Sequence, residues 1–474
     1  MTLAVDSVRA ELAALVGPSH VLADSAACTA LAVDGKVPDC AVAPATAEQV
    51  AAVLRYASEH HLAVIPHGNG TKLSMGNPPR RYDVALSLRE LNRVIHYEPA
   101  DLTISVEAGM TFGEFQNLVG RSGLWLPLDP RGGAESSLGG IIAANAAGPL
   151  RQGFGGPRDM VLGLKIATTD GKVVKTGGRV VKNVAGYDFG KLLTGSFGTL
   201  GVIVEASLKL FPKPPERATF AMRAGTLGIA RDLHRRIRRS PLDPMRLVLL
   251  DSTAAALRED SAEARELTGA ELWIELGGSH RVIERCMLEL RQLAVAVGAT
   301  MVRREEAEEA WARVSSLADW LQPKYRDLTV LKAALPVAAS EEFLSRAQQE
   351  AEADRIALAS FAQVGVGIVH LCALQEDVAR TCFVGPRLAP DGQGKAADLQ
   401  DRSALHVLGG LVARLRQAAR DLGGTLAIDH CPLDLKSGVD VWGAGGDDLE
   451  VMRKMKSAWD PQAVLSPGRF VGGI

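Results

Sequence analysis

Two glycine-rich stretches of the chain carry the residue types that bind phosphate groups. The first is "PHGNGT", residues 66–71, which directly follows the apolar run "LAVI". Glycines at this spacing let backbone N–H groups converge on an anion, and Thr71 adds a hydroxyl group. The pattern favours a phosphate cradle, although a plain turn explains this loop equally well when it is taken alone.

The second stretch, residues 128–156, is dense in glycine and also contains Ser136, Ser137 and Asn145. Its small residues let a backbone lie against a flat or extended ligand. Two separate loops that accept anions indicate a ligand with a diphosphate and a long body. A dinucleotide fits that description.

The common nucleotide motifs do not explain these loops. The fingerprint GxGxxG needs a third glycine and a following helix, and we expect neither after Gly70. A P-loop needs its lysine directly after the last glycine, whereas Thr71 stands between Gly70 and Lys72. We therefore expect the dinucleotide to be bound by a different fold.

Three stretches together resemble a known family. They are "PHGNGT" (66–71), "SSLGGIIAANAAG" (136–148) and "KNVAGYDFGKLLTGSFGTLGVIVEASLKLFPKP" (182–214), and they are similar to the FAD-binding domain of the vanillyl-alcohol-oxidase (PCMH) type. Within that family the chain most resembles the FAD-binding subunits of bacterial glycolate oxidase, the GlcE-like group, whose closing segment is similar to residues 456–470. The resemblance is strong over residues 40–215 and loose over 216–425.

The resemblance implies FAD as the cofactor and places its contacts. The loop around the diphosphate would be Pro66, His67, Gly68, Asn69, Gly70 and Thr71, acting mainly through backbone N–H groups. Ser136, Ser137, Gly139, Gly140, Asn145 and Gly148 would flank the diphosphate and the isoalloxazine, and Gly198, Thr199, Gly201 and Ile203 the ribose and adenine. Gly70 stands where some relatives tether the flavin through a histidine, so we expect non-covalent FAD. The His67 ring itself we expect to be solvated or to cap the loop.

The substrate side departs from the family pattern. Related D-2-hydroxyacid dehydrogenases carry HxGDGNxH, a metal-binding strand, followed later by Glu-His. The matching stretch here is "QVGVGIVH" (363–370), in which His370 remains and the Asp and Asn are replaced by Val366 and Ile368. Asp429-His430 matches the later pair. Two imidazoles and a carboxylate form a possible metal set, but the apolar replacements make us expect no metal.

Four side chains are the catalytic candidates: His370, His430, Lys332 and Arg469. The histidines would act as proton acceptors, and Lys332 and Arg469 would meet a substrate carboxylate or the negative charge of the flavin. Each has a structural alternative. His370 suits a hydrogen-bonded core position, His430 a structural pair with Asp429, and the two cations an ordinary surface role.

The elements that must position these residues indicate an α+β protein. A helix ending near residue 62 should lead into a strand at 63–66, and Asp170-Gly171 predicts a hairpin within 161–178. We expect a helical lead-in at 1–45, a two-subdomain FAD-binding domain at 40–215, a cap domain of helix-backed antiparallel sheet at 216–425, and a C-terminal segment at 426–474 that returns to the FAD-binding domain.

The composition of the chain argues against several classes of partner and site. Lys and Arg number 53 and Asp and Glu 55, a net charge of -2, which gives no indication of a nucleic-acid or anionic-membrane partner. The six cysteines show no CxxC spacing, so we expect reduced thiols without zinc or an iron–sulfur cluster. The first residues do not resemble a secretory signal, and no apolar run is long enough for a membrane span. We expect a cytoplasmic protein that is peripheral to a membrane only through a partner.

These observations lead to one main hypothesis and two alternatives. The main hypothesis is an FAD-dependent oxidoreductase, or its FAD-binding subunit, which oxidises a glycolate- or D-lactate-like 2-hydroxy acid. Electrons would pass to a partner, an iron–sulfur subunit or a quinone pathway. The first alternative is a non-catalytic FAD-binding or assembly subunit beside an active paralogous flavin subunit. The second is a stand-alone oxidase of sugar acids or aromatic alcohols.

Overall fold

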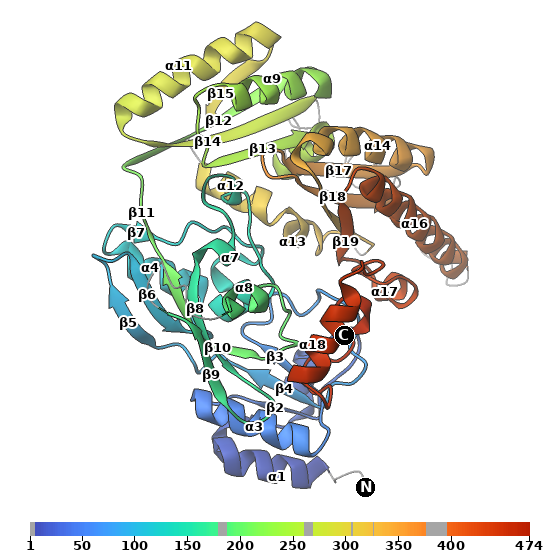
Figure 1. Ribbon diagram of the computed structural model, residues 1–474. Coiled ribbons are helices and arrows are strands. Elements are labelled where there is room, and N and C mark those ends of the chain that lie inside the picture. Colours follow the sequence, from blue (N-terminus) through green and yellow to red (C-terminus); the bar gives the residue numbers. More distant parts are fainter. Residues whose placement is uncertain (1–4, 179–186, 260–268, 305–306, 326, 376–395) are drawn as a thin grey trace. The chain divides into compact units, whose positions relative to one another are not determined.

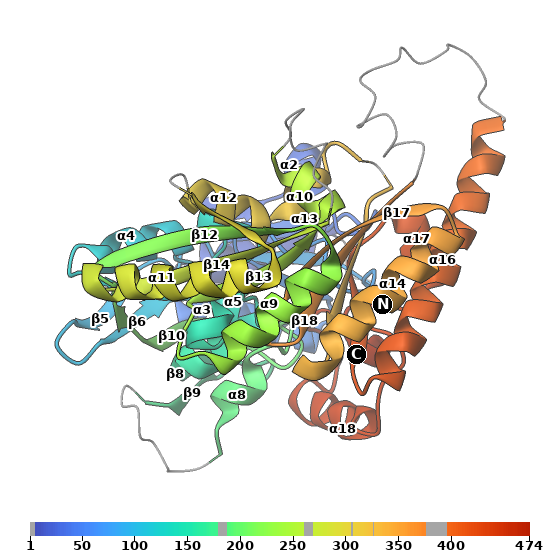
Figure 2. The same ribbon diagram turned by 90° about the horizontal axis from the view of Figure 1, so that it is seen from above.

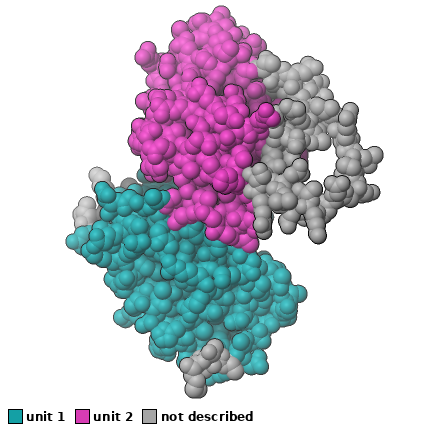
Figure 3. Space-filling view, turned by 90° about the vertical axis from the view of Figure 1, so that its right-hand side faces the viewer, with its two compact units in different colours: residues 1–148, 155–213, 444–474 teal, residues 149–154, 214–443 magenta. Residues whose placement is uncertain are grey.

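The chain folds into two compact units (Figure 3). The computed structural model describes residues 5–178, 187–259, 269–304, 307–325, 327–375 and 396–474. The first unit contains residues 1–148, 155–213 and 444–474, and the second contains residues 149–154 and 214–443. Both combine helices with sheets, so the predicted α+β class is confirmed.

A small sheet and its helices form the N-terminal half of the first unit (Figure 1). The sheet order is β1 (Val21–Leu22), β2 (Cys40–Val42), β4 (Val84–Ser87) and β3 (Val64–His67), and its last two pairings are parallel. The helices are α1 (Val5–Val16), α2 (Ser25–Ala30) and α3 (Ala47–Glu59). The Thr46 side chain caps α3, whose apolar side packs with α1 and the sheet in one core. This core fixes β3, which leads into the first glycine loop.

A five-stranded antiparallel sheet forms the other half of the first unit. Its order is β5 (Val94–Glu98), β6 (Thr103–Glu107), β10 (Val202–Lys209), β8 (Val161–Ala167) and β9 (Val173–Gly177). The hairpin predicted at Asp170-Gly171 is confirmed, because β8 and β9 pair on either side of it and Gly171 has a φ of 81°. A two-stranded ribbon joins β7 (Leu124–Trp125) to β11 (Phe211–Pro212). The helices of this half are α4 (Phe112–Gly120), α5 (Leu138–Ala143), α7 (Pro157–Met160) and α8 (Phe189–Leu193).

The C-terminal segment attaches to the first unit beside β3. Helix α18 (Leu449–Trp459) has Asp460 as its C-cap residue. The backbone then pairs with β3: Val64 N–H donates to Val464 at 2.8 Å, and Ser466 N–H donates to Val64 at 2.9 Å. The C-terminal segment thus completes the edge of the small sheet.

The second unit is an eight-stranded antiparallel sheet backed by helices, as predicted for the cap domain. Its order is β15 (Thr300–Arg304), β12 (Glu216–Ala224), β14 (Ala270–Gly278), β13 (Arg246–Asp251), β17 (Ile356–Gln363), β18 (Ile368–Gln375), β16 (Thr329–Ala334) and β19 (Thr425–His430). One face packs on α9 (Leu227–Arg239), α11 (His280–Val297), α14 (Ser340–Ala353) and α16 (Ala396–Asp421). The other face packs on α10 (Ser252–Glu259), α12 (Ala307–Ser315) and α13 (Leu317–Leu321). Figure 2 shows α14 and α16 side by side.

Two predicted boundaries were wrong. Residues 426–443, which we assigned to the returning segment, belong to the second unit, because β19 pairs with β16 there and α17 (Leu433–Gly438) follows. Residues 149–154, with α6 (Arg151–Phe154), also belong to the second unit, where Gly153 N–H donates to Met245. Both corrections arise from contacts with segments that are distant in the sequence.

The five cysteines that lie within the described residues are free, and all five are buried. They are Cys28, Cys40, Cys286, Cys372 and Cys431, while Cys382 lies outside the described residues, as do positions 182–186 of the third motif. Burial raises the pKa of the Cys40 thiol to about 12, so this thiol stays protonated at neutral pH. Across the described ranges, every helix is too short or too polar to cross a membrane.

Candidate functional site

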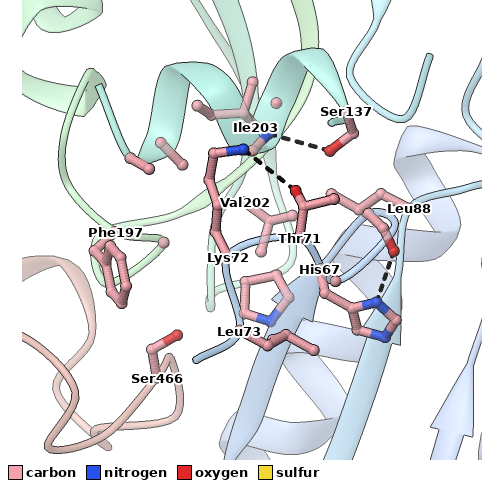
Figure 4. A pocket seen from close by; sticks show the side chains of 18 of the residues that line it. His67, Thr71, Lys72, Leu73, Leu88, Ser137, Phe197, Val202, Ile203 and Ser466 are labelled. Atoms are coloured by element: carbon pink, nitrogen blue, oxygen red, sulfur yellow. Dashed lines mark hydrogen bonds between the residues drawn. The ribbon is translucent and has the colours of Figure 1, made fainter. Parts of the chain in front are cut away.

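Three stretches of the first unit line one cavity (Figure 4). They are residues 66–73, part of 137–144 and part of 197–203, joined by Ser466 and Arg469 from the C-terminal segment. The cavity encloses roughly 750 Å³ of empty space, some of it open to solvent. Residues 67–70 also line a second hollow, so this loop stands between two open spaces. The three motifs found in the sequence therefore meet in space.

Direct contacts hold the first glycine loop against the second stretch. A β carbon at Gly68 would lie 2.2 Å from the Ser137 hydroxyl, so only glycine fits there. The Thr71 hydroxyl lies 3.2 Å from that of Ser136, and Asn69 Nδ2 donates to the Glu135 carbonyl at 2.9 Å. Because glycine has no side chain, Gly68 lets the backbone of the first loop lie this close to the second stretch.

The second stretch contains the short helix α5. The Ser137 side chain caps it by accepting from Gly140 N–H at 3.3 Å. A β carbon at Gly139 would come within 2.9 Å of Ala108, so this glycine lets α5 lie close to the backbone at 108. Gly139 and Gly140 both face the cavity.

The third stretch closes the cavity from another side. Gly198 has a φ of 69°, and a β carbon there would lie 3.1 Å from the Pro66 ring. Phe197 N–H donates to Ala143 at 2.9 Å, which ties this stretch to the end of α5. The Phe197 ring stacks with Phe470 at 6.2 Å between ring centroids.

Most of the residues predicted for the cofactor line this cavity. They are Pro66, His67, Gly68, Asn69, Gly70, Thr71, Ser137, Gly139, Gly140, Gly198, Gly201 and Ile203. Ser136, Asn145, Gly148 and Thr199 are not part of the lining. Gly148 packs against Asp129, where a β carbon would lie 2.1 Å from the carbonyl oxygen, and the Thr199 carbonyl accepts from Lys456 Nζ.

His67 is half-buried and its ring bonds back onto the loop, which is the capping arrangement that we considered beside a solvated one. Its Nδ1 lies 2.8 Å from the Gly68 carbonyl, and burial lowers the pKa of the ring. At neutral pH the ring is therefore neutral, and because Nδ1–H donates to a carbonyl, Nε2 is an acceptor. No described atom donates to this buried Nε2.

Arg469 reaches the cavity from the C-terminal segment. Its guanidinium donates to the Leu73 carbonyl at 2.5 Å and to the Met75 carbonyl, and it lies over the Phe197 ring at 5.3 Å. Burial lowers the pKa of Arg469 to about 10, so the side chain stays charged at neutral pH. The surface role considered for this arginine is therefore wrong.

Lys72 also lines the cavity, and sequence reasoning missed it. Its ammonium donates to Ser136 Oγ at 2.8 Å, to the Arg131 carbonyl at 3.1 Å and to Thr71 Oγ1 at 3.2 Å. The sequence offered one signal for this residue, because Lys72 directly follows the glycine loop. Among the described lining residues Lys72 and Arg469 are cations, and none is Asp or Glu.

The remaining candidates lie together on the sheet of the second unit. Lys332 on β16 is the register partner of His370 on β18. His370 Nδ1 lies 3.9 Å from Asp429 Oδ2, and the His370 ring stacks on Phe361 at 4.5 Å. His430 is the register partner of Val330. The His370 and Asp429 side chains are 15% and 14% exposed, so both are accessible to a small ligand.

The stretch "QVGVGIVH" has structural reasons for its two glycines. A β carbon at Gly365 would lie 1.8 Å from the Gln152 amide, and Gly367 turns the chain between β17 and β18 with a φ of 75°. Gln363 is buried. Within the described residues, no three His, Cys, Asp or Glu side chains converge as a metal site would require. His370, His430 and Asp429 are therefore not arranged as a set of metal ligands.

Comparison with protein families shows to which family the chain belongs. Residues 38–177 match the family described as "FAD binding domain", and residues 213–470 match "FAD linked oxidases, C-terminal domain". The second match alone spans more than half of the chain. The chain belongs to the FAD-linked oxidases. The predicted cofactor, FAD, and the predicted class, an FAD-dependent oxidoreductase, are both confirmed.

Relatives of this FAD-linked oxidase include enzymes named for 2-hydroxy acids. The chain is 27% identical over 440 residues to the glycolate oxidase subunit GlcD of Bacillus subtilis (strain 168), covering 92% of this chain and 89% of the relative. It is 28% identical over 439 residues to D-lactate dehydrogenase of Archaeoglobus fulgidus, covering 91% and 90%. The predicted resemblance to glycolate oxidase subunits is confirmed, with GlcD rather than a GlcE-like chain as the relative.

Solved structures confirm the fold of this FAD-linked oxidase. The 4-ethylphenol oxidase from Gulosibacter chungangensis superposes with a TM-score of 0.73 at 16% identity, covering 98% of this chain and 96% of that one. The p-cresol methylhydroxylase structure gives a TM-score of 0.73 at 17% identity with the same coverage. The predicted PCMH-type fold is therefore confirmed.

Proposed function

We propose that this FAD-linked oxidoreductase oxidises a small 2-hydroxy acid, of the glycolate or D-lactate type, and passes the electrons to a partner. The observation that carries the proposal is the single cavity shared by residues 66–73, 137–144 and 197–203. The names of the relatives support the substrate class, since glycolate and D-lactate are both 2-hydroxy acids. When bound, FAD supplies the acceptor for the hydride of the substrate α carbon.

The first unit would hold FAD without a covalent bond. Backbone N–H groups of the loop from Gly68 to Thr71 would bind the diphosphate, as in other glycine-rich anion sites. Gly70 offers no side chain for attachment, and His67 Nδ1 is already bonded to Gly68.

The second unit would contribute the groups that handle the substrate. His370, with Asp429 nearby to orient its ring, would accept the proton of the substrate hydroxyl. Lys332, its register partner, would bind the carboxylate, with His430 as a second proton acceptor. In the first unit, Arg469 would stabilise negative charge on the flavin.

The electron acceptor would lie in another subunit. The cysteines within the described ranges are buried, free and dispersed, which does not suit an iron–sulfur cluster. An iron–sulfur subunit, beside a paralogous flavin subunit, would carry the electrons onward. The chain would then be cytoplasmic and would reach a membrane only through that complex.

The test begins with the visible spectrum of the purified protein, which should show flavin bands near stoichiometry that are released by denaturation without proteolysis. Anaerobic addition of glycolate or D-lactate should then bleach these bands. The variant His370→Gln should keep the flavin and lose the bleaching. A protein that holds flavin but is not bleached by either acid would contradict the oxidase proposal.

A second candidate function is a non-catalytic FAD-binding or assembly subunit. The observation that favours it is the altered strand, where Gln363 is buried and Val366 and Ile368 replace polar residues of the family pattern. The same bleaching experiment separates the two functions. Flavin that is bound but reduced only when a catalytically active paralogue is added would support the second candidate.

A further inference from the structure

We propose that the outward side of helix α11 is a surface on which a second copy of this chain docks, with the two α11 helices antiparallel. The fold explains only the inward side of the helix, where Ile283, Cys286 and Leu290 pack into the core of the second unit. Figure 1 shows α11 on the outside of this unit. The residues of its outward side are therefore not required by the core.

Two apolar side chains lie exposed on the outward side. Leu288 is 56% exposed and Val295 is 72% exposed. They are two helical turns apart, so they form one row along the helix. Single exposed apolar residues are common on protein surfaces, but a row at this spacing is the pattern by which one helix packs against another. Covering the row would remove apolar surface of each copy from water.

Charged residues flank this row in a pattern that complements itself. Glu284 and Arg291 are exposed, and they are also two turns apart on one flank of the row. When two identical helices pack antiparallel, each flank faces the same flank of the other copy in reversed order. Glu284 then faces Arg291 of the second copy, and Arg291 faces Glu284 of the second copy. A parallel arrangement would instead bring like charges together.

The opposite flank adds no repulsion. The same reversal places Arg285 of one copy opposite the neutral Gln292 of the other. The formal net charge of the chain is -2, so two copies repel each other only weakly. A uniformly acidic or basic surface of another protein would leave either Glu284 or Arg291 opposite a like charge. A second copy satisfies both residues, and it is therefore the occupant that the charges favour.

The expected interface is small. One helix of this length packed on its own copy buries roughly 1,000 Å², which is at the low end of specific protein interfaces. We therefore expect a reversible dimer with a Kd of about 10–100 µM.

The experiment is sedimentation equilibrium of the full-length protein between about 1 and 300 µM, a range that spans the expected Kd. The wild type should shift from monomer to dimer over this range. Glu284→Arg and Arg291→Glu should each weaken the dimer by about tenfold or more, because each places two like-charge pairs in the interface. An equimolar mixture of these two variants should dimerise as the wild type does, because every pair across the interface again has opposite signs.

Two further variants separate the surface from general effects of charge. Glu352→Arg makes the same charge change on an exposed residue of α14 and should leave the dimer unchanged. Leu288→Ser should weaken the dimer without altering any charge, and circular dichroism checks that each variant is folded. A wild type that stays monomeric throughout, or a dimer that is equally strong in Glu284→Arg, would overturn the inference. The same holds for a mixture of the two charge variants that dimerises no better than either alone, and for association that requires a different protein.

Discussion

At the scale of single residues, Gly68 and Ser137 set how closely the two glycine-rich stretches approach. The β position of Gly68 lies against the Ser137 hydroxyl and β carbon. No L side chain fits this gap unless one of the two backbones moves. The cavity therefore depends on the smallest residue at one position and a small residue at the other.

We expect Gly68→Ala to weaken FAD binding at least tenfold, because the added methyl group forces the loops apart at a cost of about 1–3 kcal/mol. The double variant Gly68→Ala/Ser137→Gly removes the opposing side chain and should recover much of the affinity. Flavin fluorescence titration of the apoproteins measures both. Gly225→Ala, at a position with no neighbouring atom within 4 Å, is the matched control. Equal loss in the single and double variants would contradict the steric explanation.

The sequence predicted the residues of this site unevenly. The glycines at 68, 139 and 198 were found because glycine density and resemblance mark them directly. Gly148 was assigned to the cofactor, whereas it packs against Asp129, and sequence alone does not distinguish the two reasons for a glycine. Lys72 was missed because lysine is common on surfaces and its acceptors lie about 60 residues away in the chain.

At the scale of elements, the end of α18 is anchored by a buried ion pair. Lys456 Nζ lies 2.6 Å from Asp460 Oδ2 and also donates to the carbonyls of Thr199 and Leu465. Asp460 in turn accepts from the backbone N–H groups of Val464 and Leu465. The pair thus connects the C-terminal segment to the third stretch of the cavity and to the residues that pair with β3.

We expect Lys456→Met to destabilise the first unit by about 3–5 kcal/mol, because it leaves the Asp460 carboxylate buried without its partner. Thermal unfolding and limited proteolysis should show an earlier transition and faster cleavage within residues 444–474. Lys454→Met is the control in the same helix, since the Lys454–Glu450 pair is exposed and contributes little. Similar effects of the two substitutions would argue against the anchoring role.

The sequence predicted whether a segment forms a helix or a strand more reliably than it predicted which unit the segment joins. The strand predicted at 63–66 and the hairpin predicted within 161–178 follow from local apolar patterning and turn residues, and the structure contains both, as β3 and as the β8–β9 hairpin. Residues 149–154 and 426–443 were assigned to the wrong unit. In residues 426–443, β19 pairs with the distant strand β16, and a strand reads the same whichever sheet it joins. In residues 149–154, the short helix α6 contacts Met245 and β13, and this contact leaves no local pattern in the sequence.

At the scale of the whole molecule, the described residues that line the cavity all belong to the first unit. The second unit has its own cores on the two faces of its sheet. A ligand that binds only one folded unit stabilises that unit by mass action. FAD should therefore stabilise the first unit and leave the stability of the second unit unchanged.

We expect apoprotein to unfold in two calorimetric transitions, of which FAD raises only the one belonging to the first unit. At a free FAD concentration about 100 times the Kd, the stabilisation should be near 2.7 kcal/mol. Trp273 and Trp311 are both buried in the second unit, so a variant in which Trp125 and Trp459 of the first unit are replaced by Phe allows unfolding of the second unit to be followed by fluorescence. A single transition that moves as a whole with FAD would show that the units unfold together.

The pairing of the C-terminal segment with β3 also determines when the cavity can be completed during synthesis of the chain. Arg469 donates to the Leu73 carbonyl across 396 residues of chain, and both line the cavity. A ribosome makes the glycine loop long before it makes Ser466 and Arg469, which complete the cavity. Nascent or truncated chains that lack residues 464–469 should therefore fail to retain the flavin, so flavin retention distinguishes chains that contain this segment from chains that do not.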